Sequence, residues 1–89
     1  MSKVDVNLIS RQGNEALVKL SDRQYPGLLV QGDSLKILAD TIAEAVDAAQ
    51  LGNLEDVSYV TRELMEKIGS MMKNYEDMMS SNGLKLPYF

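Results

Sequence analysis

The hydrophobic pattern of this chain changes its period once, at Gly32-Asp33-Ser34, and that change constrains the fold more than any other feature. Before it, apolar and polar residues alternate, as they do along strands with one buried face. After it, apolar residues recur every three or four positions, as along amphipathic helices. We therefore predict an α+β fold in which a three-stranded antiparallel β-meander precedes two helices, in the order β-β-β-α-α. With 89 residues, the chain should form a single domain over 1–89.

Three segments have strand character, at about residues 3–9, 15–20 and 27–31. In the first, Val4, Val6 and Leu8 alternate with polar residues and are expected to face the core. Residues 10–14 then supply turn-forming side chains. Pro26 cannot donate to a sheet ladder, so it should stand at the start of the third strand or on an edge.

The first helix is predicted at about residues 34–51. Asp33, or alternatively Ser34, can cap its N-terminus, and Gly52 is a typical stop. Its expected buried stripe is spaced by threes and fours and consists of Leu35, Leu38, Ile42, Ala45, Val46 and Ala49.

The second helix is predicted at about residues 54–81, with Asn53 as its cap and a short apolar tail at 84–89. A helix of this length would span about 42 Å, which exceeds the width of so small a domain. It could be kinked near Gly69, leaving two shorter helices, or run on as one. Its apolar residues follow a heptad rhythm: Leu54, Val57, Thr61, Leu64, Ile68, Met71, Tyr75 and Met78.

Composition excludes several kinds of chemistry. The chain has no His, Cys or Trp, which removes imidazole bases, thiol nucleophiles, disulfides and zinc sites with nitrogen or sulfur ligands. Acidic side chains share helix faces, but no spacing isolates an acid–base pair or a hard-metal loop. We therefore expect no enzyme activity, no catalytic or metal-binding residue, and no cofactor.

The net charge of −4 is unevenly distributed. Residues 1–32 carry +1, whereas the remainder carries −5. An acidic protein repels phosphate, so nucleic acid is an unlikely partner and a basic protein fits better. The sequence shows no signal peptide or membrane span, and we expect a cytoplasmic protein with no membrane partner.

Pro26-Gly27, Gln31-Gly32-Asp33-Ser34-Leu35 and Ile42-Ala43-Glu44-Ala45-Val46 resemble the strand-to-helix segment of HicB-type antitoxins. The resemblance covers about Tyr25 to Ala48 and implies a three-stranded sheet that leads into a packed helix. It carries over neither DNA binding nor a particular toxin, since no DNA-binding segment follows. A longer stretch, from Val6 through Leu35, is similar to a small uncharacterised bacterial family.

The motif between the sheet and the first helix has a structural interpretation in capping, turn formation and packing. Its residues are Arg23, Tyr25, Pro26, Gly27, Gln31, Gly32 and Asp33.

The leading functional hypothesis is a non-enzymatic bacterial protein that masks a protein partner, as an immunity protein or antitoxin does, with a basic toxin as one such partner. Acidic residues would attract the partner, and methionine and aromatic side chains would anchor it. The predicted binding residues are Glu55, Asp56, Glu63, Glu66, Glu76, Asp77, Met65, Met72, Met79, Tyr88 and Phe89.

Two alternatives remain open. One is a self-associating assembly module, expected as a homodimer that pairs along the second helix. Its contacts would be Leu64, Ile68, Met71, Tyr75 and Met78. The weaker alternative is a nucleic-acid-binding regulator that uses the few cations of the sheet, although no aromatic platform accompanies them.

Overall fold

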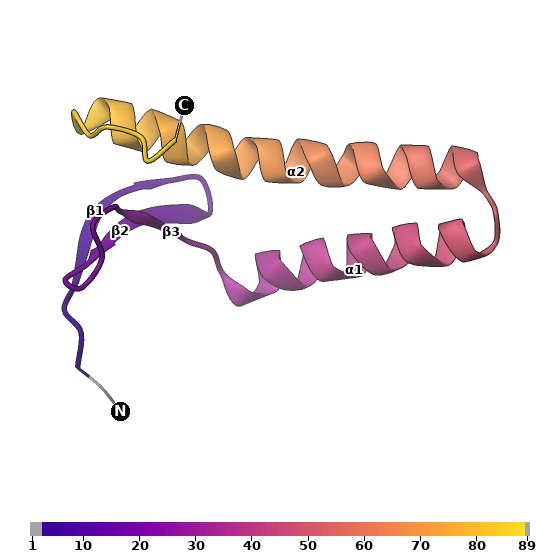
Figure 1. Cartoon of the computed structure of the whole chain (residues 1–89), viewed down its shortest axis with the longest axis horizontal. Helices are drawn as coiled ribbons and strands as arrows, with labels where there is room; N and C mark the ends of the chain where they lie inside the picture. The colour runs from indigo at the N-terminus through magenta and orange to yellow at the C-terminus, as the bar shows by residue number, and fades with distance from the viewer. Residues whose placement is uncertain (1–2, 89) are drawn as a thin grey trace. The chain divides into compact units, whose positions relative to one another are not determined.

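The computed structural model describes residues 3–88 and has the predicted α+β architecture (Figure 1). Three antiparallel strands form a meander and two helices follow it. The elements are β1 (Val6–Gln12), β2 (Glu15–Leu20), β3 (Gly27–Leu29), α1 (Gly32–Gln50) and α2 (Leu54–Ser81). The predicted position of β1 was too early, because its pairing with β2 continues to the turn.

The tight turn between β1 and β2 explains the length of both strands. Gln12 pairs with Glu15, so the connection is the two residues Gly13 and Asn14. Gly13 has φ +60°, a conformation that favours glycine at the first position of such a turn. β2 then pairs with β3 in antiparallel register.

The predicted buried face of β1 is wrong. Val6 and Leu8 are 58% and 63% exposed, and Val4 is exposed as well. The pairing with β2 shifts register between Leu8 and Ser10, a β-bulge that leaves Ile9 as the extra residue. The half-buried Ile9 therefore packs against the core, although its place in the period-2 pattern assigned it to the solvent side.

The chain divides into two compact units. We call Met1–Val30 together with Met71–Phe89 the sheet unit, and Gln31–Ser70 the hairpin unit. α2 contributes its first part to the hairpin unit and the part from Met71 onward to the sheet unit. Each unit is described by itself.

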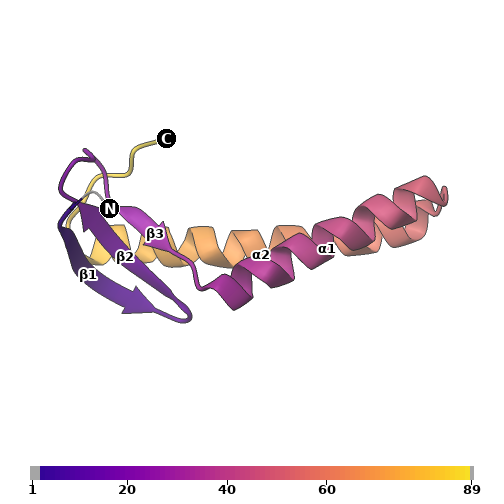
Figure 2. The same ribbon diagram turned by 90° about the horizontal axis from the view of Figure 1, so that it is seen from below.

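The sheet lies beside the last turns of α2 (Figure 2), and residues from both make the core of the sheet unit. It consists of Leu17, Tyr75, Met78 and Met79, and Ile9, Leu28 and Leu86 pack against it. The predicted tail therefore contributes Leu86 to the fold.

Tyr75 also ties α2 to the start of β3. Its hydroxyl donates a hydrogen bond to the Pro26 carbonyl oxygen at 2.7 Å, and its ring stacks on that of Tyr88 with centroids 6.4 Å apart. Burial raises the pKa of the Tyr75 hydroxyl, which favours the protonated form that donates this bond.

α1 begins earlier than predicted and without a side-chain cap. Its N-cap is Gln31, so neither Asp33 nor Ser34 caps it. Asp33 lies in the first turn instead, where its carboxylate accepts a hydrogen bond from the backbone N–H of Ser34 at 2.9 Å. An acidic side chain there suits the positive end of the helix dipole. At the other end, Gly52 has φ +70° and stops the helix as predicted.

α2 has the predicted bounds and the predicted cap. The Asn53 side-chain oxygen accepts a hydrogen bond from the backbone N–H of Asp56 at 3.1 Å, and the Asn53 amide donates to the Asp56 carboxylate at 2.8 Å. The helix continues through Gly69 to Ser81 without interruption, so the alternative of two shorter helices is wrong.

Candidate protein-binding surfaces

In the hairpin unit, α1 and the first part of α2 run antiparallel and are joined by a short turn (Figure 1). Only Thr41, Ala48 and Val60 are buried here, each with 6–9% of its surface still exposed. Half-buried residues extend these positions into a seam at heptad spacing, with Leu38 and Ala45 on α1 and Val57, Leu64 and Lys67 on α2. Two helices alone therefore cover only a narrow stripe of each other.

Both helices leave a second apolar stripe exposed. In α1, four residues that were predicted to be buried are exposed, namely Leu35, Ile42, Val46 and Ala49, and the first three form the stripe. The prediction was wrong because the seam uses the smaller Thr41 and Ala48 instead. In α2 the exposed stripe contains Leu54, Met65 and Ile68, and the first two are 81% and 71% exposed.

The two exposed stripes lie on one face of the hairpin unit. Successive helical residues turn by about 100°, which places each stripe about 100° from its own seam. Viewed from the N-terminus of each helix, the rotation from the seam to the exposed stripe has the same sense in both helices. Because the helices are antiparallel and their seams face each other, both stripes face the same side. We call Leu35, Ile42, Val46, Leu54, Met65 and Ile68 the apolar face.

The same geometry gathers acidic residues on the opposite face. The hairpin unit carries eight acidic and three basic side chains, a net charge of −5, and the sheet unit carries +1. Among the described residues, four exposed carboxylates on this side make no hydrogen bond or ion pair. We call them, with the tyrosine that they flank, the acidic face: Glu44, Asp47, Glu55, Glu66 and Tyr59.

Tyr59 is the feature that sequence reasoning missed. Its side chain is 73% exposed, and Glu55 lies one turn before it and Glu63 one turn after it on α2. Its position on the helix wheel, outside both the seam and the apolar stripe, is the sequence signal that could have identified it.

The structure divides the predicted acidic binding residues. Glu63 pairs with Lys67 at 2.7 Å, and Asp56 takes part in the α2 cap. In the sheet unit, Glu76 accepts a hydrogen bond from the Tyr88 hydroxyl at 3.0 Å, and Asp77 is paired as described below. Of the six predicted acids, Glu55 and Glu66 make no hydrogen bond or ion pair with another side chain among residues 3–88.

The predicted anchors are divided between the two units and differ in burial. Met79 is 0% exposed, so its assignment as an anchor is wrong: its thioether fills the sheet-unit core. Met65 lies on the apolar face, away from the acids. Met72 and Tyr88 are exposed on the sheet unit, and Phe89 lies outside the described residues.

The predicted self-association residues are also divided. Tyr75 and Met78 are buried in the sheet-unit core, which corrects their assignment. Leu64 belongs to the hairpin seam, and Met71 is half-buried. Ile68 alone lies on the apolar face, because the seam uses Val60 and Lys67 where the heptad pattern predicted Thr61 and Ile68.

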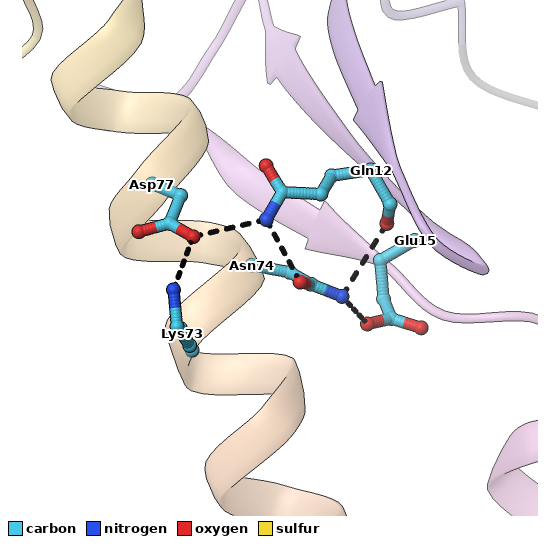
Figure 3. Close-up of polar contacts among 5 residues, drawn as sticks. All are labelled: Gln12, Glu15, Lys73, Asn74 and Asp77. Atoms are coloured by element: carbon cyan, nitrogen blue, oxygen red, sulfur yellow. Dashed lines mark hydrogen bonds and ion pairs between the residues drawn. The ribbon is translucent and has the colours of Figure 1, made fainter.

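A polar cluster joins the β1–β2 turn to α2 within the sheet unit (Figure 3). The Gln12 amide donates to Asn74 and to Asp77, both at 3.0 Å, and the Asn74 amide donates to the buried Glu15 at 2.7 Å. Lys73 pairs with Asp77 at 2.7 Å.

The charge state of this cluster follows from its hydrogen bonds. The hydrogen bond from Lys73 is the largest cause that lowers the pKa of the Asp77 carboxyl, and the hydrogen bond from Gln12 is the next. The same hydrogen bond to Asp77 raises the pKa of Lys73. The members satisfy one another, so the cluster positions α2 on the sheet. Within residues 3–88, no group of three or more acidic side chains could hold a metal ion.

The predicted structural motif spans both units. In the sheet unit, Arg23, Tyr25, Pro26 and Gly27 line a groove beside β3 with Val18, Leu20 and Leu29. Gln31, Gly32 and Asp33 form the start of α1 in the hairpin unit. No helix in the described part of the chain is long and apolar enough to cross a bilayer.

One of three comparisons with known proteins found a match, to a family of unknown function, as the resemblance of Val6 through Leu35 had implied. A search of curated proteins and a search of solved structures each found no match. Residues 1–88 match one family, described as a family of unknown function (DUF6959). The match covers nearly the whole chain, and the chain therefore belongs to the DUF6959 family.

Proposed function

We propose that this protein is a non-enzymatic bacterial protein that binds and masks a basic protein partner through its acidic face. One observation supports the proposal most directly: Tyr59, exposed by 73%, stands among carboxylates of which Glu55 and Glu66 have no contact within the described chain. Exposed tyrosines are frequent hot spots of protein interfaces, because the ring supplies contact area at a small entropic cost.

Charge placement supports the same partner class. The −5 charge of the hairpin unit would speed the encounter with a basic surface, and Glu44 and Asp47 extend the acidic face onto α1. The local resemblance of Tyr25 to Ala48 to HicB-type antitoxins supports a toxin as the partner and the cytoplasm as the location.

The test is affinity purification of the tagged chain from the organism that encodes it. We expect a co-purifying basic protein whose recovery falls at high salt and falls about tenfold or more with Tyr59→Ala. Tyr25→Ala, which removes an exposed tyrosine from the sheet unit, is the matched control and should leave recovery unchanged. Recovery of the same partner by wild type and Tyr59→Ala alike would contradict the acidic face as the binding site.

A further inference from the structure

The apolar face of the hairpin unit is independent of the acidic face and needs its own explanation. Its large side chains come from two helices and lie on one side, whereas only three residues of the unit are buried. Contiguous apolar patches of this kind on soluble proteins mark interaction sites.

We propose that a second copy of this chain covers the apolar face, so that two hairpin units form an antiparallel four-helix bundle. Helical hairpins with one apolar face build such bundles when two faces meet across a two-fold axis. The face is then its own complement, and residues such as Ile42 and Met65 become core residues of the dimer.

The size of the face falls at the lower end of the range for stable protein interfaces. At a rise of about 1.5 Å per residue, the apolar face from Leu54 to Ile68 on α2 is about 21 Å long. Two helices with axes about 9 Å apart present a width of about 20 Å. The projected area of about 420 Å² per partner is a minimum, because interdigitating side chains bury more surface than they project, and a small specific interface buries about 600 Å² per partner.

The charge distribution favours a second copy in spite of the −5 charge. The apolar face contains no charged residue. The seam beside it contains one, Lys67, which lies on the side of the seam away from the apolar face. The acids point away on the opposite face, so like charges stay apart in the dimer and repulsion is screened. A basic partner, by contrast, would find no carboxylate on the apolar face.

The experiment is sedimentation equilibrium of the purified full chain from about 1 to about 100 μM, at low and high salt. We expect twice the chain mass of 9.9 kDa at the upper concentrations, with little dependence on salt. Ile42→Glu combined with Met65→Glu should give a monomer. Ile37→Glu combined with Tyr59→Glu makes the same chemical change on exposed residues away from the apolar face, one per helix, and should remain a dimer.

A wild-type monomer at about 100 μM would overturn the proposal, whatever the variants do. The proposal would also be overturned if the Ile42→Glu and Met65→Glu variant stayed a dimer while the Ile37→Glu and Tyr59→Glu variant became a monomer. The contact between the two copies would then use the other face. Circular dichroism on each variant separates lost association from lost helix. Since the acidic face is not part of this contact, failure here would leave the proposed masking function standing, and failure of partner capture would leave the dimer standing.

Discussion

Asp77 shows how a single side chain can be assigned by its contacts. Its carboxylate is one of six acids predicted to meet a partner, yet it accepts hydrogen bonds from Gln12 and Lys73. Nothing in the spacing of α2 separates it from Glu66, because both are acids on a helix surface. The difference arises from the β1–β2 turn, which only the folded sheet unit brings to Asp77.

The lowered pKa of Asp77 predicts a pH-dependent contribution to stability. A carboxyl whose pKa is lowered on folding stabilises the fold above its ordinary value of 3.8, and this contribution is lost as the pH falls through the folded pKa. Lys73 has a raised pKa, so its part is present below 10.5 and is lost as the pH rises through the folded value. Asp77→Asn should therefore lower the Tm by a constant amount between about pH 5 and about pH 10, with a smaller difference outside that range.

Thermal melts of wild type and Asp77→Asn across pH test this expectation. Asp22→Asn is the matched control, because the exposed Asp22 side chain makes no hydrogen bond or ion pair with the rest of the described chain. If the Tm difference between wild type and Asp77→Asn were as large at about pH 3 as at neutral pH, the charge of Asp77 would not contribute to stability.

The methionines illustrate the limit of prediction at this scale. Met65 and Met79 stand on the same helix, and both were predicted to anchor a partner. The first is exposed, whereas the second is fully buried in the sheet unit. A flexible apolar side chain suits a core and an interface equally well, so residue type alone cannot distinguish them.

At the scale of elements, the order and the approximate bounds followed from local signals. β2 and α2 have the predicted limits, since hydrophobic period, turn residues and the Asn53 cap are properties of neighbouring residues. The face that each element buries could not be predicted in this way. The bulge at Ile9 depends on pairing with β2, and the seam of α1 depends on its contact with α2.

The cap of α2 gives a prediction at this scale. Asn53→Ala removes the acceptor for the Asp56 N–H and should cost about 1 kcal/mol of helix stability. Asn53→Ser keeps an oxygen at the same place and should cost much less. Native-state hydrogen exchange at the first turn of α2 measures both. Equal loss of protection in the two variants would mean that the cap contributes nothing.

For the whole molecule, the charge split predicted from sequence coincides closely with the two units. The near-neutral part is the sheet unit and the −5 part is the hairpin unit. That contact with a partner runs along the helix after Asn53 stays a prediction, and α1 also contributes residues to both faces of the hairpin unit.

The central claim is that the two faces of the hairpin unit have different partners. Site-specific photo-crosslinking in the organism of origin tests it directly, with a photoreactive amino acid at position 65 in one experiment and at position 59 in another. We predict a covalent dimer of this chain from position 65, and an adduct with a different, basic protein from position 59. A homodimer from position 59, or the same adduct from both positions, would contradict the account.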